Sequence, residues 1–179
     1  MDVYMDAVLH PNIYKEEKIF RQEGWHYELE SEDGPLTYNG VVYNEMKGAF
    51  SSPESVLDRL IQQTLFPDTC YGVESGGDPK NIPDLTYEQF LNFHRTYYHP
   101  SNFIYLYGDM DMAEKLEWLD QEYLSHYDRN DREAQIDSHI PMQKGFDAPK
   151  EVEAAYSITE EEDEENGCYL SISDVVGTD

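Results

Sequence analysis

Basic residues are scarce in this sequence, in which 12 lysines and arginines stand against 38 aspartates and glutamates among 179 residues. The formal net charge is therefore -26 at neutral pH. Because phosphate groups repel a polyanion, nucleic acids and anionic membrane surfaces are excluded as natural partners. The same charge attracts basic peptides and metal cations. An acidic surface that serves only solubility explains the charge equally well.

Cysteines are few, and long hydrophobic runs are absent. The two cysteines, Cys70 and Cys168, are too far apart to indicate a disulfide framework or a zinc-binding motif. No stretch of about 18 apolar residues occurs, and the first residues lack the basic region and apolar run of a targeting segment. We therefore expect no membrane segment and a reducing, cytoplasmic location.

Short catalytic motifs are also missing. The sequence has six histidines, but none belongs to an H-E-x-x-H or H-x-x-E-H pattern. It contains no G-x-S-x-G motif, no P-loop and no dinucleotide fingerprint. Local motifs alone therefore identify no enzyme class.

The residues that are present are sufficient for a folded core. Hydrophobic residues make up 39% and aromatic residues 13%, which suits one domain, or one domain with part of a second. Hydrophobic periodicity and end signals predict helices over residues 1–9, 15–22, 40–50, 52–65, 86–98 and 111–127. Three of these helices begin at clear capping residues, namely Ser52, Thr86 and Asp111.

Strand-like segments alternate with these helices. A period-two pattern predicts a strand over 25–29, and the apolar run 103–107 predicts a central strand buried on both faces. Residues 152–158 and 168–176 are predicted as a hairpin around an acidic loop, and a calcium site in that loop is disfavoured because the EF-hand spacing is missing. Residues 66–85 are predicted as a long loop. The chain is thus predicted to be an acidic α+β protein.

One carboxylate is oddly placed in this pattern. If residues 40–50 are helical, Glu45 lies between Val41 and Ala49 on an apolar stripe, away from the polar side that carries Lys47. A buried carboxylate is costly unless it is hydrogen-bonded, neutralised or bound to a metal ion. Periodicity alone does not choose among these outcomes.

Four separated motifs resemble one known family. They are Pro11-Asn-Ile-Tyr, Phe20-Arg-Gln-Glu-Gly-Trp-His-Tyr-Glu28, Gly40-Val-Val-Tyr-Asn-Glu-Met-Lys-Gly48 and Tyr97-Tyr-His-Pro-Ser-Asn102. Together they are similar to the presequence-protease branch of the pitrilysin and insulin-degrading-enzyme (insulinase) family. The resemblance implies helices on a mainly antiparallel sheet, as in part of a LuxS/MPP-like metalloendopeptidase domain, with a C-terminal hairpin from a following domain.

The resemblance also implies a chemistry. Members of the family are zinc endopeptidases that enclose short unfolded peptides, and their H-x-x-E-H motif supplies two histidine ligands and a general base. A glutamate on a downstream helix is the third zinc ligand, and Glu45 matches it. This chain lacks the H-x-x-E-H motif, so we expect an internal segment that neither holds zinc tightly nor cleaves peptides by itself.

The resemblance further implies a division of the chain. Residues 1–128 correspond to the C-terminal part of the first catalytic-half domain, 129–150 to a linker and 151–179 to the first hairpin of the next domain. The expected partners are short, basic peptides and the remainder of the peptidase. A homodimer through exposed strand edges is a further expectation. A non-catalytic peptide-binding relative and a free-standing acidic structural protein are the alternatives.

Overall fold

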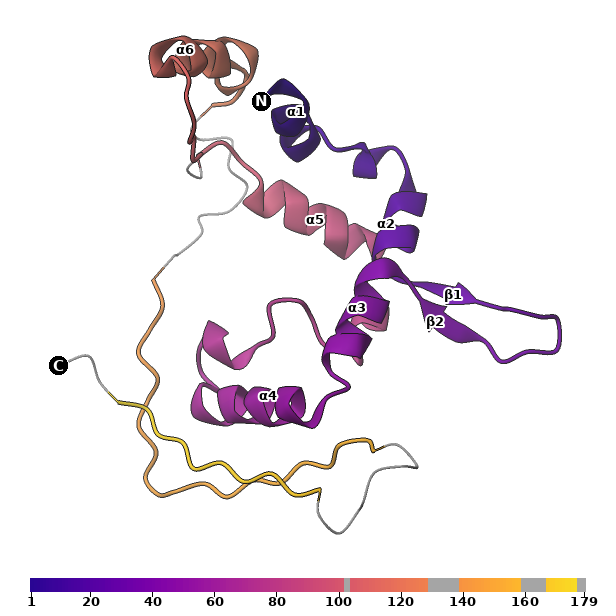
Figure 1. Ribbon diagram of the computed structural model, residues 1–179. Helices are drawn as coiled ribbons and strands as arrows, with labels where there is room; N and C mark the ends of the chain where they lie inside the picture. Colours follow the sequence, from indigo (N-terminus) through magenta and orange to yellow (C-terminus); the bar gives the residue numbers. More distant parts are fainter. Residues whose placement is uncertain (102–103, 129–138, 159–166, 177–179) are drawn as a thin grey trace. The chain divides into compact units, whose positions relative to one another are not determined.

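The computed structural model describes residues 1–101, 104–128, 139–158 and 167–176, which form six α-helices and one two-stranded sheet (Figure 1). The chain divides into two compact units, residues 1–20 with 85–137 and residues 21–84 with 138–179. In chain order the elements are α1 (Asp2–Leu9), α2 (Glu17–Glu23), β1 (His26–Glu28), β2 (Thr37–Asn39), α3 (Val41–Ala49), α4 (Pro53–Leu65), α5 (Tyr87–Tyr97) and α6 (Met112–Glu122).

The three helix starts predicted from capping residues are confirmed. Each capping side chain forms a hydrogen bond with a backbone N–H group nearby in the sequence. The Ser52 hydroxyl accepts a hydrogen bond from the backbone N–H three residues on, at 3.2 Å, at the start of α4. Thr86 and Gln89 form a reciprocal capping box on α5, and Asp111 caps α6 at 3.1 Å. Such caps satisfy backbone donors that have no partner within the helix.

The first unit joins α1 to α6 through a small core. Leu119 is almost fully buried, and it clusters with Met5 and Tyr123. The Tyr123 hydroxyl donates to the Asp2 carboxylate at 2.6 Å. This hydrogen bond, with burial as a second cause, raises the pKa of Tyr123 to about 12.

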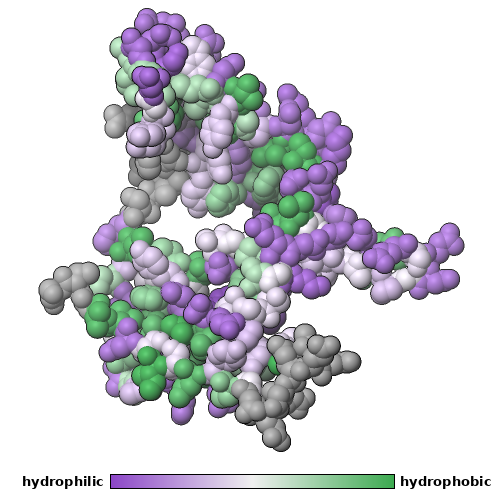
Figure 2. All heavy atoms as spheres, in the orientation of Figure 1, coloured by the Kyte–Doolittle hydropathy of each residue, from purple (hydrophilic) through white to green (hydrophobic). Residues whose placement is uncertain are grey.

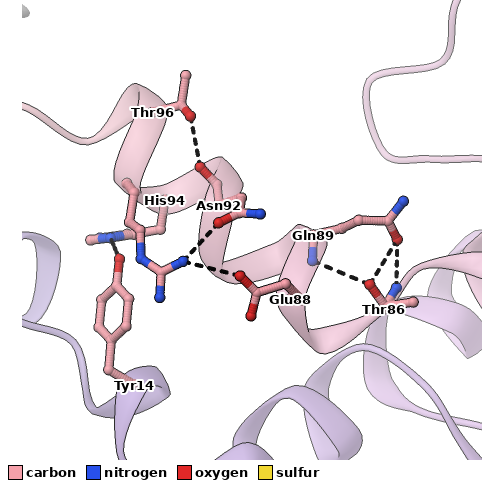
Figure 3. A network of polar contacts seen from close by, with 8 residues as sticks. Tyr14, Thr86, Glu88, Gln89, Asn92, His94 and Thr96 are labelled. Atoms are coloured by element: carbon pink, nitrogen blue, oxygen red, sulfur yellow. Dashed lines mark hydrogen bonds and ion pairs between the residues drawn. The ribbon is translucent and has the colours of Figure 1, made fainter. Parts of the chain in front are cut away.

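His94 of α5 fastens the N-terminal segment of the same unit (Figure 3). Its Nε2 lies 2.8 Å from the Val8 carbonyl, which can only accept, so Nε2 carries the proton of the neutral ring. Nδ1 then accepts from the Tyr14 hydroxyl at 2.7 Å. One buttressing contact comes from Tyr87, whose hydroxyl donates to the Ile13 carbonyl. Side chains of α5 therefore bind Val8, Ile13 and Tyr14.

The second unit contains the sheet and the helix that follows it. β1 and β2 are antiparallel, with His26 opposite Asn39 and Tyr27 opposite Tyr38. The first strand was predicted, whereas β2 was not. Trp25 is buried beside the hairpin and makes an edge contact with the Tyr38 ring. The chain passes directly from β2 into α3.

Two predicted strand regions are not strands in the structure. Residues 104–107 form no strand, although a buried central strand was expected at 103–107, and Tyr105 and Tyr107 are exposed. Residues 152–158 and 167–176 also lack strand structure, and no backbone hydrogen bond joins them within the described ranges. Apolar strands need a neighbouring ladder and a covered face. The described residues offer these segments no neighbouring ladder, although Leu106 packs against the core of the first unit.

The C-terminal segments are nevertheless in contact. The Tyr156 hydroxyl donates to the Gly167 carbonyl, and its ring meets the ring of Tyr169 edge-on. Gln143 binds both the backbone N–H and the carboxylate of Asp68, at 3.1 and 2.7 Å, within the second unit. The predicted acidic loop and the first half of the predicted linker lie outside the described residues.

Hydrophobic surface is abundant on this chain. Figure 2 shows hydrophobic residues on the outside of the molecule, and large exposed side chains include Val41, Tyr105, Leu170 and Ile172. The observed α+β composition matches the prediction at that level. No helix in the described ranges is long and apolar enough to cross a bilayer.

Candidate functional site

Glu45 lies in the middle of α3, as predicted, but it is exposed. The apolar stripe on either side of it is also exposed, with Val41 at 52% and Val42 at 38% of full accessibility. The expectation of a carboxylate buried among aliphatic side chains is therefore wrong for this chain. The physical reason is that no described residue covers this face of α3, so the carboxylate keeps its hydration and needs no compensating partner.

The surroundings of Glu45 determine what it can bind. No hydrogen bond or ion pair joins its carboxylate to another residue in the described part of the chain. No group of three His, Cys, Asp or Glu side chains there is arranged to hold a metal ion. A catalytic zinc site requires three protein ligands. The described residues therefore supply one candidate zinc ligand, the Glu45 carboxylate, and they do not form a complete zinc site.

The start of α3 is fixed by a short polar network centred on Asn39. Its Oδ1 accepts from the backbone N–H of Gly40 at 2.7 Å and from the side-chain amide of Asn44 at 2.6 Å. Its Nδ2 donates to the Glu28 carboxylate at 2.6 Å. The backbone N–H can only donate and the carboxylate can only accept, so the amide orientation of Asn39 is unambiguous. β1, β2 and α3 are thus joined through one side chain.

Gly40 permits the close approach that this network requires. Its φ is 151°, and a Cβ on it would lie 2.3 Å from the Gly24 carbonyl oxygen and 2.7 Å from the Trp25 Cα. The same Gly24 carbonyl accepts from the backbone N–H of Tyr43 at 3.3 Å. The residues before β1 therefore contact the first turn of α3 directly, which only glycine at position 40 allows.

An open hollow of about 290 Å³ lies beside the C-terminal half of α3. Met46 and Phe50 contribute apolar surface, and Asp58 and Glu74 contribute carboxylates. The Arg59 guanidinium stacks 3.6 Å from the Phe50 ring centroid. The hollow is thus an apolar surface bordered by charged groups.

The Asn39 network was not predicted, although the sequence contains a signal for it. Residues 36–39 alternate between apolar and polar side chains, which is the pattern of a short strand. The Asn-Gly pair that follows marks a sharp change of backbone direction. The partners Glu28 and Asn44 carry no such signal, because their proximity depends on the strand register.

Comparison with known proteins agrees with the resemblance described above. A family model described as the Peptidase M16 inactive domain matches residues 84–175. Protein HypA of Clostridium perfringens (strain 13 / Type A) is 54% identical over 178 residues, which are 99% of this chain and 18% of that protein. This chain belongs to the M16 peptidase family, the insulinase and pitrilysin family.

Further relatives agree with the branch that the motifs indicated. Presequence protease 1, chloroplastic/mitochondrial, of Arabidopsis thaliana is 49% identical over 150 residues, which are 83% of this chain and 14% of that protein. The mitochondrial presequence protease of Xenopus tropicalis is 41% identical over 163 residues, covering 89% of this chain and 15% of that protein. The resemblance to the presequence-protease branch is thereby confirmed. The chain spans less than a fifth of the length of these relatives.

Proposed function

We propose that this chain is a segment of a zinc metalloendopeptidase of the presequence-protease type, and that Glu45 is the third protein ligand of its zinc. The complete enzyme degrades short unstructured peptides. Membership of the M16 family and similarity to proteins named presequence protease support this proposal. In this proposal the fold is part of a LuxS/MPP-like domain followed by the first hairpin of the next domain.

The observation that carries the proposal is the position of Glu45. Its carboxylate is exposed on a helix whose first turn is anchored to a hairpin. No described residue forms a hydrogen bond or an ion pair with this carboxylate. An accessible carboxylate oxygen is a suitable zinc ligand, and bound zinc would activate a water molecule for attack on a peptide bond. The two histidine ligands and the general base would come from residues outside this chain.

The charge of the chain supports basic peptides as substrates. A formal charge of -26 raises the local concentration of cations and accelerates their association at low ionic strength. It disfavours nucleic acids and anionic membranes, which we therefore do not propose as partners. We propose a cytoplasmic location on the basis of the two exposed free cysteines, Cys70 and Cys168.

The division of the chain remains part of the proposal. Residues 1–128 would form the C-terminal part of the first catalytic-half domain, and residues 129–150 would link this domain to the next one. Residues 151–179 would form the first hairpin of the next domain. The exposed apolar side chains of α3 and of the C-terminal segment support burial against the remainder of the peptidase. Neither outer edge of the β1–β2 pair has a strand partner within the described ranges, so a second copy is the alternative partner. Light scattering distinguishes a dimer from a monomer.

The test uses the complete gene product that contains this segment. Glu45→Gln is expected to lose zinc, measured by elemental analysis after dialysis, and to lose hydrolysis of a basic, unstructured peptide. Glu153→Gln is a charge-matched control, because Glu153 is exposed on an extended segment. The 179-residue chain alone should retain well under one zinc ion per molecule. Stoichiometric zinc in this chain, or unchanged zinc content in Glu45→Gln, would contradict the proposal.

A second candidate function is a non-catalytic peptide-binding or structural relative of the peptidase. The absence of any three-residue metal group among the described residues agrees with it, as it does with the first candidate. The two functions differ in the coding sequence upstream of Met1, where an in-frame H-x-x-E-H motif would support the enzyme. A peptide that binds with no turnover and with no effect of zinc chelation would instead support the relative.

A further inference from the structure

The position of Glu45 depends on side chains that do not contact it. Glu45 follows Asn44, whose amide is bound by Asn39 at 2.6 Å, and Asn39 also binds the N–H of Gly40 directly before α3. The residue directly before the helix and the first turn of the helix are therefore tied to the same oxygen atom. Asn44, the second residue so tied, directly precedes Glu45 in the chain.

The other end of the Asn39 amide is tied to the hairpin. Glu28 of β1 accepts from Asn39 Nδ2 at 2.6 Å, and this bond spans the two strands. The three bonds use both ends of one planar amide, so rotating the amide would break all of them. Charged acceptors strengthen such bonds. Asn39 thus ties the start of α3 to both strands of the hairpin.

We propose that Asn39 and Asn44 are positioning residues for Glu45 as a metal ligand. This inference rests on the proposed function. A metal ligand must be held within about 0.5 Å of its productive place, and the loss of groups that orient a ligand typically lowers metal affinity 10- to 100-fold. Asn39→Ala and Asn44→Ala are therefore expected to weaken zinc binding about 10-fold or more. Zinc affinity is measured in the complete gene product by competition with a chromophoric chelator, which needs no turnover.

Exchanging the carboxylate and the amide between positions 28 and 39 should restore zinc affinity. Asn39→Asp keeps the oxygen that accepts from Gly40 and Asn44, but it places a second carboxylate against Glu28, so zinc affinity should fall. Adding Glu28→Gln restores a donor to this contact and returns the net charge to its original value. The double variant should bind zinc within about threefold of the wild-type protein. Recovery in the double variant would tie the loss of affinity to the contact between positions 28 and 39.

Two controls separate positioning from stability. Thr86→Ala removes a helix cap in the other compact unit and should leave zinc affinity unchanged. Lys47→Gln removes a charge from α3 itself, where Lys47 is exposed, and should also have no effect. Amide hydrogen exchange in the first turn of α3 should accelerate in Asn39→Ala and return to normal in the double variant.

The outcomes distinguish this inference from the proposed function. If Glu45→Gln binds zinc like the wild-type protein, the proposed function fails and the inference fails with it. If Glu45→Gln loses zinc while both alanine variants bind it normally, only the inference is overturned. Failure of the double variant to regain the affinity lost in Asn39→Ala would overturn it as well. Loss in the alanine variants and recovery in the double variant would establish it.

Discussion

Replacement of Gly40 by alanine should strongly destabilise the second unit. The new Cβ would lie 2.3 Å from the Gly24 carbonyl oxygen and 2.7 Å from the Trp25 Cα, which are backbone atoms that cannot rotate away. The φ of 151° adds strain of about 1–3 kcal/mol for a residue with a side chain. With the clash included, Gly40→Ala should cost about 3–5 kcal/mol, near the upper limit for single substitutions.

Gly48 provides a control within α3 itself. No atom lies within 4 Å of a Cβ built at Gly48, and its φ is not positive. Gly48→Ala should therefore stabilise α3 by about 0.5–1 kcal/mol, because alanine loses less conformational entropy than glycine in a helix. The two alanine substitutions should thus have effects of opposite sign, although one lies directly before α3 and the other within it.

Urea unfolding of the 179-residue chain, followed by far-ultraviolet circular dichroism, measures both effects. Native domains are stable by only about 5–15 kcal/mol, so Gly40→Ala should shift the midpoint far downward. Equal midpoints for Gly40→Ala and the wild-type chain would refute the close crossing of Gly40 and Gly24. Destabilisation by Gly48→Ala would show that the face of α3 at this position is covered.

Three further predictions concern the first unit. His94→Ala should cost about 2 kcal/mol in urea unfolding, because it removes two hydrogen bonds, and Tyr14→Phe should cost about half as much because it removes one. Tyr123 in its neutral form donates to Asp2, and its pKa is raised to about 12. Its stabilising effect should therefore be complete below pH about 10 and disappear as the pH rises through about 12, so that the thermal midpoints of Tyr123→Phe and the wild-type chain converge there. Thr86→Ala should cost about 1 kcal/mol and accelerate amide hydrogen exchange in the first turn of α5.

Local signals predicted the helices well. The starts at Ser52, Thr86 and Asp111 are observed, since each cap binds a backbone group within three residues. The helix carrying Glu45 was also predicted from the residues between Gly40 and Phe50. Strand prediction was poorer: residues 104–107 and the C-terminal segments have strand-forming composition but no strand structure. A strand needs a partner in register, and sequence periodicity does not supply one.

The sequence by itself determined the starts of α4, α5 and α6, the acidic charge, the place of Glu45 in its helix and the family to which the chain belongs. These properties are encoded in neighbouring residues or in motifs along the chain. The sequence did not determine where α6 ends, because a helix was predicted over 111–127 and α6 stops at Glu122. Only the tertiary structure decided that Glu45 is exposed and that Asn39 joins Glu28 to the start of α3. Both depend on which residues that are distant in the sequence lie close together in the fold. The same is true of the need for glycine at position 40, where a Cβ would lie 2.3 Å from the Gly24 carbonyl oxygen.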